Sequence, residues 1–312
     1  MDVQLTDASD TVDKFECFMA GNGVSIPRHP QTAADMLPFW YLLKRIGQGF
    51  SGTADEVRPE FTAAVAAHDL AAKVLEVSGN ADFRCLLPHL KMLNAGTIHL
   101  TEEPPANADT YNKLIELYWS CLCLSLGRKV DLDHPVQSTG NNPDVIILDN
   151  AGAAARAYAF KTIRSPHTQN VYDHISKGID QIERSPAREG IIALHLTPRI
   201  AKAGFWPMGG YYQDWQPVAW QIASELRKAV AAVVEDNGQR AINTLFKDRK
   251  AVGQILCVAF CPIVAKHPVS GKAVVMPLKV ATLVDLYTGT RMSADFLTEI
   301  ALANHAMQTV LA

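Results

Sequence analysis

Residues 109–196 show an ordered series of helix and strand patterns that constrains the fold more than any other part of the chain. The segment from Asp109 to Leu126 is predicted to form one helix, with Asn107 or Asp109 as its N-cap and Gly127 as its stop. Three strand runs, a helix and a buried strand follow it, at residues 129–136, 144–148, 157–163, 169–183 and 190–196. Asn150–Gly152 supplies a hairpin turn between the second and third runs. This order predicts an α/β fold.

The segment before this series has a different pattern. Apolar spacing predicts helices in Ala33–Ile46, Thr53–Leu75 and Asp82–Leu93. The proline-containing stretch EEPPANAD at 102–109 is the best candidate for a domain boundary. We therefore expect a mostly helical N-terminal domain, 1–108, and a second domain, 109–312.

The last third of the chain continues the α/β pattern. A helix is predicted at residues 217–235, and two strand runs at 253–265 and 272–286 are joined by the turn-rich residues 267–271. A final helix is expected from Ser293, a suitable N-cap, to Leu311. Its apolar character makes it a candidate homodimer interface. The glycine- and aromatic-rich residues 204–212 are interpreted as a lid over the core, with stacking on nucleic-acid bases as the alternative.

Composition and charge narrow the functional classes. The net charge of −3 argues against a protein that coats DNA over its whole surface, so a nucleic-acid contact would require a local groove. The six cysteines show no zinc-site spacing, and the N-terminal sequence does not resemble a secretory signal. The apolar runs are too short to span a membrane. We expect a cytoplasmic protein with no membrane partner.

One pair of strands carries residues suited to hydrolytic chemistry. Pro143-Asp144 opens the second strand run, and Lys161 lies on the third, after the hairpin turn. This arrangement resembles the PD-(D/E)XK nuclease superfamily. The resemblance implies a restriction-endonuclease-like fold with a mixed central sheet flanked by helices. It also implies that acidic side chains bind Mg²⁺ or Mn²⁺ and that the lysine orients the attacking water.

The resemblance assigns roles to particular residues. Asp144 corresponds to the first acid and Lys161 to the lysine, while Phe160 is the intervening residue, whose carbonyl can face the metal. Ala159 stands where the second acid belongs, and a methyl group cannot bind a cation. Glu116, on the preceding helix, matches a position from which superfamily members reach the metal.

The helix after Lys161 also fits the pattern. It carries Lys177 and Gln181 on one face, where a basic or amide residue supports the phosphate in such folds.

Each of these residues also has a structural interpretation. Asp144 could end a turn, Lys161 could be a solvated charge, and Glu116 and Gln181 could lie on helix surfaces. His195, in the apolar run ALHLT, is interpreted as a core histidine rather than a base.

Ala159 admits three explanations. In the first, another acid takes over the metal site, with Glu116 preferred to Asp149 and Glu183. In the second, the chain keeps the fold only to bind nucleic acid or protein. In the third, the alanine replaces an original glutamate. The first and third explanations favour a metal-dependent deoxyribonuclease, and a restriction or anti-phage defence role would fit the resemblance. The alternative is a catalytically inactive subunit that binds nucleic acid or a protein partner.

Overall fold

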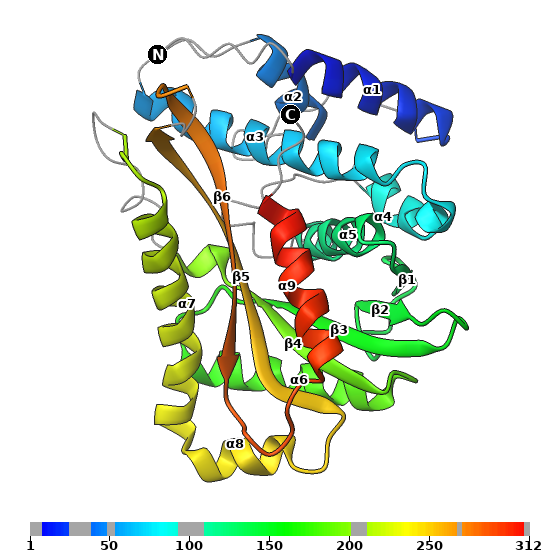
Figure 1. The fold of residues 1–312 in the computed structure, drawn as a ribbon, viewed down its shortest axis with the longest axis vertical. Coiled ribbons are helices and arrows are strands. Elements are labelled where there is room, and N and C mark those ends of the chain that lie inside the picture. The colour runs from blue at the N-terminus through cyan, green and yellow to red at the C-terminus, as the bar shows by residue number, and fades with distance from the viewer. Residues whose placement is uncertain are drawn as a thin grey trace.

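The computed structural model describes most of the chain. The described residues are 8–24, 39–48, 54–92, 109–200, 211–266 and 270–308. They form a six-stranded mixed sheet with helices on both faces (Figure 1). The expected α/β class is therefore confirmed.

The strands lie side by side in their chain order. They are β1 (Lys129–Leu132), β2 (Val145–Leu148), β3 (Ala154–Thr162), β4 (Glu189–His195), β5 (Ala251–Lys266) and β6 (Ala273–Asp285). β1, β2 and β3 pair antiparallel, β3, β4 and β5 pair parallel, and β6 is antiparallel to β5. Parallel neighbours need a crossover connection. The crossovers contain α6 (Thr168–Arg184) and then α7 (Gln216–Asn237), which is followed by the short α8 (Gln239–Phe246).

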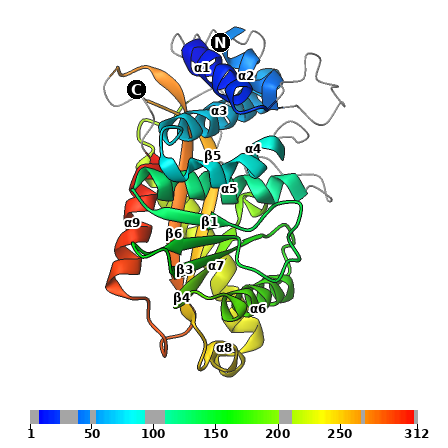
Figure 2. The same cartoon turned by 90° about the vertical axis from the view of Figure 1, so that its right-hand side faces the viewer.

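The two faces of β3 belong to different hydrophobic cores. Tyr158 and Phe160 lie in a core with α5 (Asp109–Ser125) and α9 (Ala294–Gln308). Ala157 and Ala159 lie in a second core with α6 and α7. Figure 2 shows α9 and α6 on opposite sides of the strands. This alternation follows from the two-residue period of a strand.

The helices of the N-terminal part gather at one end of the sheet, beside α5 (Figure 1). They are α1 (Ala8–Gly21), α2 (Phe39–Gln48), α3 (Ala54–Glu76), the 3₁₀ helix η1 (Ala81–Leu86) and α4 (Leu87–Met92). Their buried apolar side chains belong to the same core as α5 and the sheet. The described part of residues 1–108 therefore packs directly onto the rest of the chain.

A buried polar contact links this helical part to the sheet. The Lys279 ammonium group on β6 donates to Asp69 Oδ1 on α3 at 2.8 Å, and the Tyr118 hydroxyl on α5 donates to Asp69 Oδ2 at 2.8 Å. Lys279 is 3% exposed and Asp69 7% exposed. Both carboxylate oxygens are thus satisfied, as a buried charge requires.

Several expected boundaries hold, and their local causes are visible. Gly127 has a φ of 72°, and the amide of the next residue, Arg128, donates to the Cys123 carbonyl at 3.0 Å, which ends α5. At the start of α9, the Ser293 hydroxyl accepts the amide of Phe296 at 3.3 Å.

Other boundaries differ from the expectation. The first strand ends at Leu132 rather than at residue 136. There the ring of His134 accepts the amides of Val136 and Gln137, and Pro135 has no amide hydrogen to donate to a ladder. Helices α1 and α8 are not among the elements predicted from the sequence. No helix within the described ranges is long and apolar enough to cross a membrane.

Candidate functional site

Asp144 is fixed at the point where β2 and β3 begin to pair. Its amide donates to the Tyr158 carbonyl at 3.0 Å, and its Oδ2 accepts the Phe160 amide at 2.7 Å. β2 begins at the next residue, so its backbone does not extend far enough to accept the Phe160 amide. The carboxylate takes that place and is held beside the end of β3.

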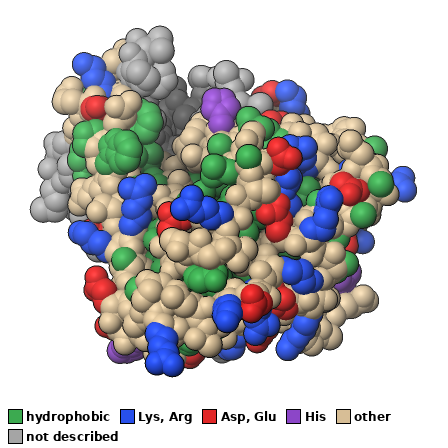
Figure 3. Space-filling view, turned by 60° about the horizontal axis from the view of Figure 1, so that its bottom comes forward, with side chains coloured by type: hydrophobic (Ala, Val, Ile, Leu, Met, Phe, Trp, Pro, Cys, Tyr) green, Lys and Arg blue, Asp and Glu red, His purple; other side chains and the backbone are tan. Residues whose placement is uncertain are grey.

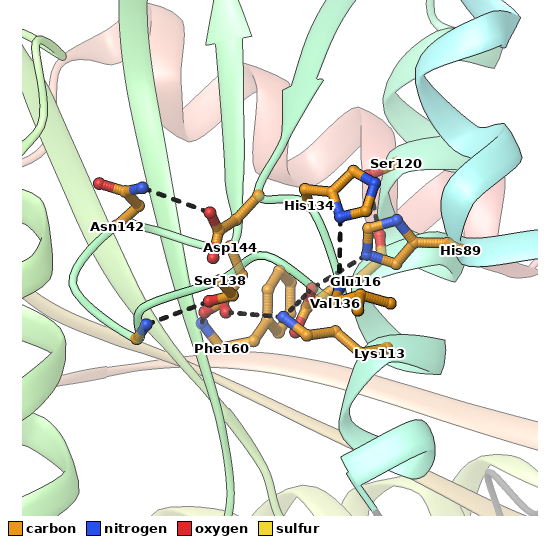
Figure 4. A network of polar contacts seen from close by, with 12 residues as sticks. His89, Lys113, Glu116, Ser120, His134, Val136, Ser138, Asn142, Asp144 and Phe160 are labelled. Carbon is orange, nitrogen blue, oxygen red and sulfur yellow. Dashed lines mark hydrogen bonds and ion pairs between the residues drawn. The ribbon is translucent and has the colours of Figure 1, made fainter. Parts of the chain in front are cut away.

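Glu116 reaches the same place from α5. Its carboxylate is almost fully buried and accepts from the Lys113 ammonium group at 2.9 Å. The His89 Nε2 atom, on α4, lies 3.3 Å from the same oxygen. Lys113 Nζ also lies 3.8 Å from Asp144 Oδ1, so a single ammonium group contacts both carboxylates (Figure 4).

Lys161 completes the cluster at the end of β3. Its ammonium group donates to the Phe160 carbonyl at 2.8 Å and lies 3.5 Å from Asp144 Oδ2. The structure therefore brings together Glu116, Asp144, Phe160 and Lys161. We call Glu116 and Asp144 the acid pair.

Burial makes ionisation of the acid pair costly. It raises the pKa of Glu116 to about 7, although the neighbouring Lys113 opposes the shift. Burial and the nearby charge of Glu116 raise the pKa of Asp144 to about 7, against the effect of Lys161. Burial also lowers the pKa of His89 to about 3, so this ring is neutral and can donate its Nε2 hydrogen to Glu116.

These shifts give the stability of the protein a defined pH dependence. Both folded-state pKa values lie above the ordinary 4.5 and 3.8, so the folded state holds protons that the unfolded state has already released. The corresponding stability is fully present below about pH 4 and is lost as the pH rises through about 7. Replacing Glu116→Gln together with Asp144→Asn is expected to reduce the fall in unfolding free energy between pH 5 and 8 by about 5 kcal/mol. Urea denaturation across this range measures the unfolding free energy at each pH, with Asp149→Asn as the control. If the unfolding free energy of wild type and double variant depends on pH with the same slope, the raised pKa values of Glu116 and Asp144 are contradicted.

Two polar members of the cluster were not identified from the sequence. Lys113 lies three residues before Glu116, a spacing that places both on one face of a predicted helix, so this signal was available. His89 comes from a separate helix, and nothing in its local sequence indicates that α4 packs against α5.

Ala159 lies in the core beneath α6. It is fully buried, and its Cβ would be 3.5 Å from a Cβ atom placed on Gly178 of α6. A glutamate side chain at residue 159 would have to enter this packed layer. The second carboxylate of the cluster comes instead from Glu116 on α5, the helix that packs on the opposite face of β3.

Gln181 holds the loop that precedes β2. Its side chain is buried, and its Nε2 atom donates to the Gly140 carbonyl at 3.0 Å. The next turn of α6 adds a contact of 2.6 Å between Arg184 and Asn141. Gln181 therefore positions the loop, while Lys177 is exposed on the same helix.

The other acids and the histidine considered from the sequence have structural partners elsewhere. Asp149 accepts the amides of Ala151 and Ala153 in the β2–β3 turn, and Glu183 accepts the amide of Lys250. His195 is buried, with its Nε2 atom 2.8 Å from the Thr197 hydroxyl. The aromatic stretch 204–212 falls outside the described residues except for Tyr211 and Tyr212, and Tyr212 pairs with the end of β5.

Comparison of the chain with family models, with curated proteins and with solved structures finds no match. Within the described part of the chain, no three His, Cys, Asp or Glu side chains form a metal-binding group. The carboxylates of Glu116 and Asp144 share the Lys113 ammonium group, and Asp144 and the Phe160 carbonyl share the Lys161 ammonium group.

Proposed function

We propose that the chain is a metal-dependent nuclease that hydrolyses phosphodiester bonds in DNA, and a divergent relative of the PD-(D/E)XK nucleases. The observation that carries the proposal is the meeting of Glu116, Asp144 and Lys161 at one end of β3, from three separate elements. Two carboxylates are buried there against two lysines, although an apolar core would be the less costly filling. Such an arrangement is typical of a functional site.

The donor set suits a hard divalent cation. Mg²⁺ binds oxygen ligands and is commonly held by one or two carboxylates, with water and substrate phosphate completing its shell. Glu116 and Asp144 would hold Mg²⁺ or Mn²⁺, and the Phe160 carbonyl accepts from the Lys161 ammonium group that also contacts Asp144. The cation would supply Lewis-acid polarisation of the phosphate ester. Lys161 would orient the attacking water and stabilise negative charge that develops on the phosphate.

Basic side chains next to Lys161 support an anionic substrate. Burial lowers the pKa of His174, and the positive charges of Lys177, Lys161 and Arg164 lower it further. These three side chains therefore lie near the His174 ring. Two nitrogens of the Arg164 guanidinium group, Nε and Nη2, are shielded from solvent and have no hydrogen-bond partner among the described residues. On the face that Figure 3 shows, Lys and Arg side chains are interspersed with Asp and Glu. Attraction of a nucleic acid therefore has to be local.

Removing the Arg164 charge tests this local attraction. Arg164→Met is expected to weaken DNA binding and to reduce the slope of log affinity against log salt by about 1, because one phosphate contact is lost. Fluorescence anisotropy over a salt series, without divalent cation, measures the slope. Arg188→Met is the matched control, since Arg188 pairs with Asp149 at the other end of β3. A salt slope equal to that of wild type would contradict the role given to Arg164.

The cleavage activity itself is tested with supercoiled plasmid. Wild type with Mg²⁺ or Mn²⁺ is expected to nick the plasmid, and Asp144→Asn is expected to be inactive. Asp149→Asn, which alters a carboxylate in the turn outside the acid pair, is expected to remain active. Equal cleavage by wild type and Asp144→Asn, or no cleavage by wild type with either cation, would overturn the proposal. A single-stranded RNA substrate in the same assay separates DNA from RNA preference.

One observation supports the non-catalytic alternative. Lys113 and Lys161 supply two positive charges beside two carboxylates, so the cluster has balanced charges without a metal. In that case the site would be a structural ion-pair network in a subunit that binds nucleic acid or protein. This alternative requires that Mn²⁺ neither stabilises the protein nor supports nicking.

A further inference from the structure

Lys113 has a distinctive position between the two carboxylates. Its ammonium group lies 2.9 Å from Glu116 Oε2 and 3.8 Å from Asp144 Oδ1. It is therefore a single positive charge that joins an acid from α5 with an acid from the start of β2, as Figure 4 shows. Lys161 does not do this, because its contacts are the Phe160 carbonyl and one oxygen of Asp144, Oδ2.

The side chain of Lys113 also has a route away from the acid pair. It is 14% exposed, whereas the Glu116 side chain is 3% exposed. A lysine carries its compact charge on a flexible four-carbon stem. The ammonium group can therefore move toward solvent by rotation of the side chain while α5 stays in place.

We infer that the Lys113 ammonium group occupies the place where a divalent cation would meet Glu116 and Asp144, and that the cation binds only when Lys113 leaves. The inference rests on the proposed function, because it assumes that the acid pair is a cation site. Both positive groups need the same oxygens, Glu116 Oε2 and Asp144 Oδ1, and at such short range they repel each other strongly. Lys113 thus competes with the divalent cation, and its positive charge offsets the negative charge of the acid pair while no cation is bound.

Lys113 is then a positioning residue that weakens cation binding. Removing a group that supports the cation ligands would weaken the binding of the cation, whereas removing Lys113 would strengthen it. Lys113→Met removes the competing charge and leaves both carboxylates in place. The affinity for Mn²⁺ is then expected to rise at least tenfold. Lys129→Met is the matched control, because Lys129 is exposed at the end of β1 remote from Asp144. This control is expected to leave the Mn²⁺ affinity unchanged.

Electron paramagnetic resonance of free and bound Mn²⁺ measures these affinities without reference to activity. Tighter binding by Lys113→Met than by wild type and Lys129→Met supports the inference. Binding by wild type that is equal to or tighter than binding by Lys113→Met would overturn the inference and leave the proposed function standing. No binding by any of the three proteins would overturn both.

A second measurement on the wild-type chain applies even if Lys113→Met does not fold. Reductive methylation, read residue by residue by mass spectrometry, reports how accessible each lysine amine is. Adding Mg²⁺ or Mn²⁺ is expected to increase labelling of Lys113 several-fold and to leave Lys129 unchanged. If a divalent cation binds while Lys113 stays as protected as before, the inference is wrong.

Discussion

Replacing Lys279 with methionine is expected to lower the free energy of unfolding by about 3–5 kcal/mol. The ammonium group of Lys279 is the charged partner of Asp69, and both side chains are buried where α3 meets β6. Lys279→Met leaves the Asp69 carboxylate in the core, where the Tyr118 hydroxyl still donates to it but the positive charge that faced it is removed. A buried carboxylate without a counter-charge is strongly destabilising, whereas replacing both partners can be nearly neutral.

Urea denaturation at neutral pH measures this effect. The double variant Asp69→Asn, Lys279→Met is expected to recover a large part of the lost stability, because the amide needs no counter-charge. Lys272→Met is the control, since Lys272 is exposed near the start of β6. A loss for Lys279→Met no larger than that for Lys272→Met would show that this contact does not tie the N-terminal helices to the sheet.

Replacing Lys161 with methionine is expected to lower the rate of plasmid nicking by about 10²–10³-fold. Its amine lies beside Asp144 and the Phe160 carbonyl, where it can orient water and meet the charge that develops on the phosphate. The aliphatic stem of methionine preserves most of the packing at the end of β3, so the fold is expected to survive. Mn²⁺ affinity is expected to be retained, because both carboxylates remain.

Single-turnover nicking at saturating Mg²⁺ measures the chemical step. Lys129→Met serves again as the control for loss of an exposed lysine and is expected to cleave at the wild-type rate. If Lys161→Met also cleaves at the wild-type rate, Lys161 is a structural ion-pair partner of Asp144 and the proposed role fails.

The parts of the fold that could be predicted are those with strong local signals. The helix before the sheet had a periodic apolar pattern and Gly127 as a stop, and both features appear in the structure. The strands could be predicted because short strand-like runs are separated by turn residues. The helix at Ala8–Gly21 was missed because many of its residues are polar, and only its tertiary contacts through residues such as Phe15 and Met19 reveal a buried face.

The candidate site could be predicted only where chain order carried information. Asp144 and Lys161 flank one hairpin, so strand pairing brings them together, and Glu116 lies on the helix just before the sheet. His89 could not be placed, because its contact with Glu116 depends on how α4 packs against α5. The same limit applies to Asp69 and Lys279, which are distant in the sequence and meet only through the tertiary fold.

We propose that Glu116 and Asp144 form a divalent-cation site next to Lys161. The most direct test is a crystal of the wild-type protein soaked with Mn²⁺ and measured at a wavelength where manganese scatters anomalously. We expect an anomalous peak in contact with the carboxylates of both Glu116 and Asp144, and no such peak in Asp144→Asn. A wild-type crystal without this peak, with Lys113 still lying between the two carboxylates, would contradict the claim.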